Sequence, residues 1–296
     1  MEISPQNNLD LRYSWYFLSI MTLSFAVSFI DRQVMTLLIE PIKSDLLIND
    51  TQVSLLIGFA FSIFYISMAI PIARLVDRGN RVNIISLGVF FWSLMTAVCG
   101  LAKNYWQLFL ARVGVGVGEA TLTPAVYSLI PDYFPKEKLG TAVGFYMLGM
   151  SFGTGFALVL GGAILSYVSN IGDIVFPIVG TLRPWQVTFV IVGLPGIFLA
   201  LLIKLSIKEP VRRNIFDNDS SSIDKTSLIS FLDDNKKTLS LITLAYSFGG
   251  MVFYGFLTWI PEHLRRAFDW DISNAGYVFG LMLASVGQDS LSDITR

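Results

Sequence analysis

The sequence is poor in charged side chains and almost free of cysteine and histidine. Charged residues make up 15% of its 296 residues, against about 25% in a typical soluble domain. Cys99 is the only cysteine, which excludes an intramolecular disulfide framework and a cysteine-rich metal site. His263 is the only histidine, so histidine-based catalysis or metal ligation is not expected. A net charge of -1 leaves no basic surplus for nucleic-acid phosphates. We therefore expect no enzyme activity, no metal, no cofactor and no nucleic-acid partner.

Apolar residues dominate what remains. Hydrophobic residues account for 53% of the chain, and its mean hydropathy is +0.62. A helix needs about 20 residues to cross the hydrocarbon core of a bilayer. Seven apolar segments are long enough: Tyr13 to Ile39, Val53 to Ala73, Val82 to Ala102, Trp106 to Ile130, Leu139 to Val168, Trp185 to Leu205 and Thr238 to Ile260. An eighth run begins near Asn274 and turns polar at Gln288. The sequence predicts an all-α integral membrane protein.

Lysine and arginine are distributed unevenly between the two sides that these spans define. The excess lies on the side of the N-terminus, which predicts a cytoplasmic N-terminus. The sequence has no basic stretch before its first apolar run, so no cleaved signal peptide is expected. We expect a multi-pass protein of the bacterial inner membrane.

The polar stretches divide the chain into four parts. Residues 1–12 form a cytoplasmic tail, 13–205 a six-helix half, 206–237 a cytoplasmic linker, and 238–296 the start of a second half. The mixed charges and serines of the linker favour a solvated connector. Its segment "SLISFL" is also compatible with a short helix at the membrane interface.

The run "ARVGVGVGEATLTPA", from Ala111 to Ala125, raises the question of what its glycines do. A phosphate-binding glycine motif follows a strand and opens a helix, whereas these glycines lie within an apolar helical segment. Small residues in membrane helices allow close helix contact. The fifth span has a similar stripe at four-residue spacing: Gly149, Gly153, Ala157 and Gly161. We predict that the glycines serve helix packing.

Glu119 lies in the same run, about 20 Å from Trp106 at 1.5 Å per residue, and therefore near the middle of the bilayer. It shares a helix face with Arg112, opposite Gly114 and Gly118. Ionisable residues at such depth are costly and typically face a bundle interior or a watery cavity. The alternative is a purely structural Glu119 that pairs with Arg112 or Arg32. Arg112 could equally extend to the outer interface.

The first span carries its own charges in "SFIDRQVMTLLIEP". Apolar residues resume after Arg32, so we expect the helix to continue with Asp31 and Arg32 inside the membrane. Ser24 and Ser28 share the face of Asp31. The alternative is that Asp31 and Arg32 mark the outer end of the helix.

The loop after the second span, "PIARLVDRGNR", carries a more specific pattern. Its Asp77, Arg78 and Arg81 resemble the D-R-x-x-R part of the cytoplasmic loop motif of the major facilitator superfamily. The family usually has glycine at the position of Ala73. The segments "SFIDRQVMTLLIEPIK", "ARVGVGVGEATLTPAVYSLIPDYFP" and "YGFLTWIPEHLRRAF" resemble the first, fourth and seventh helices of its spinster-like branch.

This resemblance implies a fold and a mechanism. The fold is the major facilitator fold, here a six-helix N-terminal half plus the start of the C-terminal half. Members transport solutes by alternating access around a cavity between two six-helix halves. By resemblance, Asp31 and Glu119 would take up and release a coupling proton. Burial favours a protonated carboxyl and a nearby arginine favours the carboxylate, so Arg32 or Arg112 would set the exchange.

The other implied roles concern the substrate and a gate. Arg32 and Arg112 could instead hold an anionic group of the substrate. Aromatic residues expected around the same cavity are Tyr65, Tyr146 and Tyr254. The motif residues expected to latch a cytoplasmic gate against the other half are Asp77, Arg78 and Arg81. The expected substrate is a small organic or amphiphilic solute, with organic anions and sugar acids as one class and lipid-like amphiphiles as the other.

The polar run after the eighth apolar segment suggests that the C-terminal half stops within its second helix. On that interpretation the chain is a shortened, inactive or partial product, and a second chain would complete the bundle. A non-transporting assembly or receptor subunit is the alternative function. An intramembrane acid protease would need two carboxyl groups sharing one proton, which adjacent arginines oppose.

Overall fold

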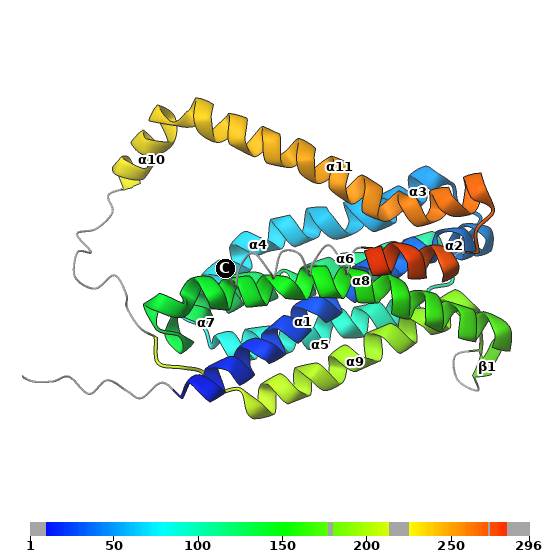
Figure 1. The fold of residues 1–296 in the computed structure, drawn as a ribbon, viewed down its shortest axis with the longest axis horizontal. Helices are drawn as coiled ribbons and strands as arrows, with labels where there is room; N and C mark the ends of the chain where they lie inside the picture. Colours follow the sequence, from blue (N-terminus) through cyan, green and yellow to red (C-terminus); the bar gives the residue numbers. More distant parts are fainter. Residues whose placement is uncertain (1–9, 177–179, 213–224, 272, 283–296) are drawn as a thin grey trace, which may run out of the picture.

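The fold is a bundle of long helices, as the composition predicts (Figure 1). The computed structural model describes residues 10–176, 180–212, 225–271 and 273–282. Seven helices in these ranges are long and apolar enough to cross a membrane. The helices before the hairpin are α1 (Leu11–Leu37), α2 (Ile39–Leu46), α3 (Asp50–Ser54), the π-helix η1 (Leu55–Phe59), α4 (Ala60–Arg78), α5 (Arg81–Cys99), α6 (Tyr105–Glu119), α7 (Leu122–Tyr133), the 3₁₀ turn η2 (Lys136–Lys138) and α8 (Leu139–Ile171). They are followed by β1 (Ile174–Phe176), β2 (Gly180–Leu182), α9 (Pro184–Ser206), α10 (Lys225–Asp234), α11 (Lys236–Phe268) and a helix over residues 273–282.

The short elements include two that sequence periodicity did not predict. β1 and β2 form an antiparallel hairpin between α8 and α9, in which Val175 pairs with Thr181. The linker segment "SLISFL" lies within α10 and is helical. Its placement at a membrane interface stays a prediction. The N-terminal tail up to residue 9, linker residues 213–224, the end of the eighth run and the polar residues 288–296 lie outside the described residues.

Three irregularities interrupt the spanning helices, and prolines explain two of them. Pro41 has no N–H to donate to the carbonyl of Leu37, and its ring would collide with that carbonyl, so α1 ends and α2 begins after a bend at Leu38. Pro124 has the same effect on the turn before it, and the fourth span divides into α6 and α7. Glu119 is therefore the last residue of α6. The third irregularity is the π-helix η1 in the second span.

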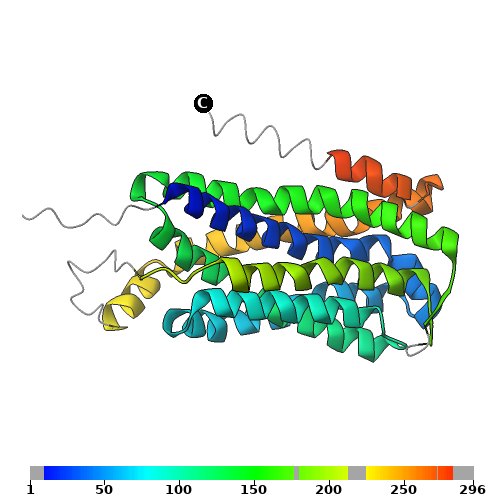
Figure 2. The same ribbon diagram turned by 90° about the horizontal axis from the view of Figure 1, so that it is seen from below.

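Close helix packing depends on the glycines. α1 packs along α8, α5 packs along α9 and α6, and α4 packs along α6; α1 and α8 lie side by side in both views (Figures 1 and 2). A Cβ atom on Gly153 would lie 2.6 Å from the carbonyl oxygen of Ala26, and one on Gly118 would lie 2.8 Å from the backbone nitrogen of Trp92. This confirms the packing role predicted for the glycines.

Alanine at Gly153 is expected to destabilise the bundle. The new methyl group would meet the backbone of α1, which must move, and overpacking of this kind costs about 1–3 kcal/mol. Gly144→Ala is the matched control, because the same helix offers its Cβ open space. Both variants share any gain in helix propensity. Unfolding midpoints in detergent should be lower for Gly153→Ala than for Gly144→Ala; equal midpoints would contradict the packing role.

Within the described part of the chain, the last long helix packs on the bundle through its C-terminal half. The described buried residues of α11 are Leu257, Pro261 and Glu262. In Figure 1 this end of α11 lies near α2 and α3, whereas the end next to α10 lies apart from the bundle. We call these two ends of the molecule the α2 end and the α10 end.

Candidate functional site

A buried ion pair joins the first and fourth spans. Arg32 of α1 donates from Nε to Oε2 of Glu119 over 2.6 Å, and its Nη2 contacts the same oxygen. The Glu119 side chain is 1% exposed. Of the two arginines that the sequence offers as partners, the structure selects Arg32. The other oxygen, Glu119 Oε1, is buried without a hydrogen-bond partner.

Aromatic rings surround the Arg32 guanidinium. Its Cζ lies 4.9 Å from the centre of the Phe29 ring, 4.6 Å from that of Phe61 and 5.3 Å from that of Tyr65. Each face-on contact is a cation–π interaction, which is stronger where water is excluded. The rings and Glu119 together hold Arg32 at a fixed position beside the cavity described below.

Asp31 and Arg112 form the second half of this charged group. Asp31 is fully buried and accepts a hydrogen bond from Thr96 Oγ1 at 3.3 Å, while its Oδ1 has no partner. α1 continues beyond it to Leu37, so Asp31 lies within the helix and does not mark its end. Arg112 is 1% exposed and does not extend to an interface. Its Nε and Nη1 are buried without hydrogen-bond partners, and its charge acts on both Asp31 and Glu119.

A cavity of about 340 Å³ adjoins these charges. Its lining residues are Arg32, Gln33, Thr36, Ile57, Gly58, Phe61, Ser62, Tyr65, Ile66, Arg112, Tyr254 and Thr258. Four of the five predicted substrate-binding residues therefore lie on it. The fifth, Tyr146, is fully buried and stacks on Phe25 with ring centres 4.7 Å apart. Tyr146 therefore packs against α1 through Phe25 and does not line the cavity.

Sequence reasoning missed eight of the twelve lining residues, among them Gly58, Phe61 and Ser62. Gly58, Phe61, Ser62 and Tyr65 line the cavity from η1 and α4, and their spacing of three, four and seven residues is the signal of one helix face. Gly58 leaves open space, because a Cβ atom placed on it would meet nothing within 4 Å. π-Helical turns occur frequently at functional sites, and this one borders the cavity.

The loop motif lies at the α10 end, where its Arg81 pairs with α7 and with the start of the linker. Arg81 is buried and donates from Nη1 to Asp132 Oδ2 over 2.5 Å and from Nε to Glu209 Oε1 over 2.6 Å. This differs from the expected pairing with the other half, because Asp132 lies in the last turn of α7 and Glu209 lies three residues after the end of α9. Asp77 and Arg78 are exposed.

The start of the linker binds the same loop. Glu209 Oε2 accepts a hydrogen bond from the Val82 backbone N–H at 3.0 Å, close to the N-terminus of α5. Arg212 donates to the carbonyl oxygens of Val76, Asp77 and Gly79 at the end of α4. A carboxylate at a helix N-terminus and an arginine at a helix C-terminus both match the helix dipoles. The start of the linker, with Glu209 and Arg212, is thus an ordered segment bound to this loop, and we call it the strap.

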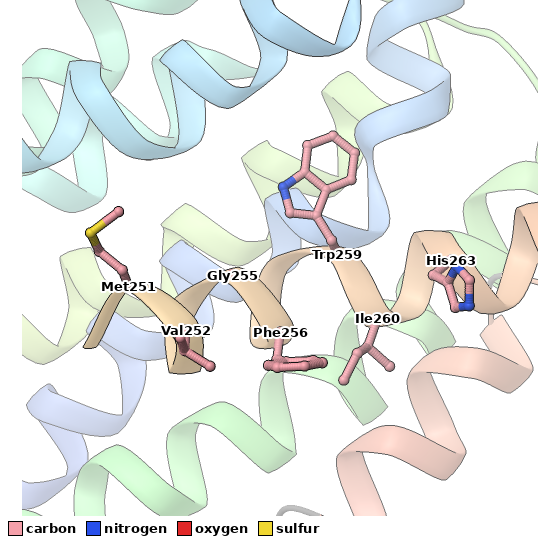
Figure 3. Close-up of a pocket in the computed structure, with 7 residues that line it drawn as sticks. All are labelled: Met251, Val252, Gly255, Phe256, Trp259, Ile260 and His263. Carbon is pink, nitrogen blue, oxygen red and sulfur yellow. The ribbon is translucent and has the colours of Figure 1, made fainter. Parts of the chain in front are cut away.

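A second hollow, of about 590 Å³, follows one face of α11 (Figure 3). Its lining residues are Met251, Val252, Gly255, Phe256, Trp259, Ile260 and His263. The lining is almost wholly apolar and contains none of the charged residues described above. We assign no solute to this hollow.

Comparison with known proteins gives a consistent result. The sequence profile of the Major Facilitator Superfamily matches residues 21–294. A solved structure of a bacterial homolog to the human lysosomal transporter Spinster, in an inward-facing and unoccupied conformation, superposes with a TM-score of 0.81 at 35% identity. That match covers 92% of this chain and 60% of the other.

Two curated relatives agree with this match. An MFS-type efflux pump of Mycolicibacterium smegmatis is 27% identical over 276 residues, which cover 93% of this chain and 60% of the pump. A probable L-galactonate transporter of Escherichia coli is 25% identical over 260 residues, or 84% of this chain and 54% of the transporter. The chain thus spans little more than half the length of these proteins.

Proposed function

This chain belongs to the Major Facilitator Superfamily, and on that premise we propose that it transports a small organic anion by proton-coupled alternating access. It is a multi-pass membrane protein of a transporter family and not an enzyme. The observation that carries the proposal is the Arg32–Glu119 ion pair beside a cavity of about 340 Å³.

The ion pair supports a coupling mechanism because its arginine is also a cavity residue. An anionic solute in the cavity competes with Glu119 for Arg32. A carboxylate that loses its arginine in a buried site is costly unless it takes up a proton. Solute binding at Arg32 and protonation of Glu119 then favour each other. Release of the solute returns Arg32 to Glu119 and expels the proton.

Asp31 and Arg112, the second pair of charges, would affect the same exchange between proton and solute. Asp31 and Arg112 lie within electrostatic reach of one another, and no ion pair joins them among the described residues. In the described part of the chain, Asp31 Oδ1 and Arg112 Nε and Nη1 have no hydrogen-bond partner, so these atoms are available to bind a proton or a solute anion. We assign Asp31 a second proton-binding role and Arg112 a second anion-binding role.

The polar cavity lining favours a sugar acid over a lipid-like amphiphile. Gln33, Thr36, Ser62 and Thr258 offer amide and hydroxyl groups next to the two arginines. A sugar acid combines one carboxylate with several hydroxyl groups, and the E. coli relative is described as a probable transporter of such a compound, L-galactonate. The rings of Phe61 and Tyr65 supply the apolar wall that solute pockets commonly have.

We place the α10 end on the cytoplasmic side of a bacterial inner membrane, with the N-terminus, as the positive-inside rule favours. We infer that the solute enters the cavity from this side; the end of α11 next to α10, which lies apart from the bundle in Figure 1, then faces the cytoplasm. Asp77, Arg78 and Arg81 would guard this entrance. Arg81 pairs with Asp132 and with Glu209 of the linker, so it is not engaged in closing this entrance.

Uptake into proteoliposomes tests this function. With the protein reconstituted, an imposed pH gradient should drive accumulation of radiolabelled L-galactonate, and a protonophore should abolish it. A neutral sugar alcohol of equal size is the matched control and should not accumulate. Accumulation of a phosphorylated amphiphile in place of the sugar acid would favour the second substrate class. Binding without any accumulation would favour a receptor or assembly subunit.

A further inference from the structure

The ring of Phe61 in α4 lies against both arginines of the charged group. Its centre is 4.6 Å from Cζ of Arg32 and 5.6 Å from Cζ of Arg112. Phe61 lines the cavity and is 7% exposed. The electron-rich face of an aromatic ring attracts a cation, and the attraction is stronger where water is excluded. One buried ring therefore attracts two cations at the wall of the cavity.

The two arginines differ in what else holds them. Arg32 also binds Glu119 and lies over two further rings. Arg112 forms no ion pair among the described residues, and its Nε and Nη1 lack hydrogen-bond partners there. Its described cation–π contact is the one with Phe61. The position of Arg112 therefore depends on this ring more strongly than the position of Arg32 does.

A glycine of α6 allows the ring to reach this position. Gly116 lies one helical turn after Arg112 on the same face. A Cβ atom on Gly116 would lie 2.5 Å from the carbonyl oxygen of Phe61 and 3.4 Å from its Cα. A side chain at position 116 would therefore meet the backbone of α4 and move the Phe61 ring away from Arg112.

The shared ring prepares the two cations for an anion. Like charges repel one another, and the ring offsets part of this repulsion before a solute arrives. A long side chain that becomes ordered only on binding reduces the affinity, whereas one that is already in place does not. Arg112 is held in place by the ring in the absence of solute.

We propose that Phe61 is a positioning residue of the anion site: its ring, which Gly116 admits, holds Arg112 beside Arg32 so that both guanidinium groups contact the same solute anion. This role rests on the proposed function for the anion that the site takes. Phe61 acts through the arginines and has no charge of its own. Its loss therefore weakens anion binding without removing a proton-binding group.

Site-resolved modification of arginine tests the positioning without a solute. Phenylglyoxal, a small dicarbonyl that reacts with guanidinium groups, is added to the whole protein in detergent. Peptide mass spectrometry then measures the modification rates of Arg112 and Arg32 separately. Phe61→Leu should raise the rate several-fold at Arg112 and less at Arg32. Phe61→Tyr keeps the ring and should leave both rates unchanged.

Tyr65→Leu is the matched control for a cavity that is simply wider. It removes a ring of similar size from the same wall. Among the described contacts, that ring lies over Arg32, at 5.3 Å, and not over Arg112. The rate should therefore rise at Arg32 and stay unchanged at Arg112. An equal rise at Arg112 in Tyr65→Leu and Phe61→Leu would mean that the ring only limits access, and would refute the positioning role.

Solute affinity provides the second measurement, with radiolabelled L-galactonate as the probe. Phe61→Leu should raise its Kd about tenfold, as expected for the loss of a desolvated cation–π contact, and Phe61→Tyr should not. In an Arg112→Ala background the same Phe61→Leu change should raise Kd by about threefold or less, because the ring then positions one cation fewer. An equal effect of Phe61→Leu in both backgrounds would contradict the positioning of Arg112.

A substitution in α6 moves the ring without altering it. Gly116→Ala should raise the Arg112 modification rate and the Kd as Phe61→Leu does, and it serves as the test if Phe61→Leu fails to fold. Gly114→Ala is its matched control, because the new methyl group would meet only the flexible Met95 side chain. Both measurements should be unchanged in Gly114→Ala.

The outcomes separate this role from the transport function. If the unaltered protein binds no sugar acid, the proposed function fails, and the modification rates still decide whether Phe61 positions Arg112. If the unaltered protein binds the sugar acid but Arg112 reacts equally fast in Phe61→Leu, the positioning role is refuted and the proposed function stands.

Discussion

Glu119→Gln is expected to abolish proton-driven accumulation of the sugar acid while solute exchange between two compartments continues. Glutamine has nearly the same shape, so the cavity keeps its form, but it cannot take up or release a proton. Arg32 then has no carboxylate that competes with the solute. The measurement is pH-gradient-driven uptake compared with counterflow of labelled against unlabelled solute, in proteoliposomes with equal protein content.

The matched control for this variant is Glu137→Gln in the exposed turn η2, which makes the same chemical change outside the membrane-spanning helices. Its uptake and exchange should equal those of the unaltered protein. Persistence of pH-driven accumulation in Glu119→Gln would contradict the coupling role. Asp31→Asn would then be the next variant to assay, because Asp31 is the other fully buried carboxyl group beside the arginines.

Arg81→Ala is expected to lower the free energy of unfolding by about 3–5 kcal/mol, the cost of removing one partner from a buried ion pair. Asp132, with a side chain 5% exposed, would lose its arginine. Glu209 would lose the same partner, and the strap formed by the start of the linker would loosen. Unfolding in detergent, by heat or by a denaturing surfactant, measures the change.

Arg78→Ala is the control within the same motif. Arg78 is exposed, and a surface substitution of this kind changes stability by about 0.5 kcal/mol or less. Two arginines three residues apart should therefore differ by several kcal/mol. Equal stabilities for the two variants would mean that the Arg81 ion pairs contribute nothing beyond what water offers.

The sequence predicts where the spanning helices lie but not where each helix begins and ends. The apolar runs predicted seven spanning helices, and the structure has seven among its described residues. Length and apolar composition suffice because a helix in lipid must satisfy its own backbone hydrogen bonds. The bend at Leu38 and the division after Glu119 were missed, although Pro41 and Pro124 were visible, since proline is often tolerated within membrane helices.

The sequence predicted the charged residues of the site but not which of them form an ion pair. Helical periodicity placed Arg112 and Glu119 on one polar face, and the embedded charges identified Asp31 and Arg32 as further candidates. Periodicity within one helix cannot decide which arginine of another helix meets Glu119. Tyr146 illustrates the same limit: it lies in α8, no residue of which lines the cavity, and its ring stacks on Phe25 of α1.

The sequence by itself determined that this protein crosses a membrane in several helices, that its glycines serve packing, and that a few charges remain inside. These conclusions depend on the cost of exposing polar groups to lipid, which acts on each segment separately. Only the tertiary structure decided that Arg32 meets Glu119, that Arg81 meets Asp132, and that the Phe61 ring lies against both Arg32 and Arg112. Such contacts depend on how neighbouring helices are rotated and displaced against one another, and no single segment carries that information.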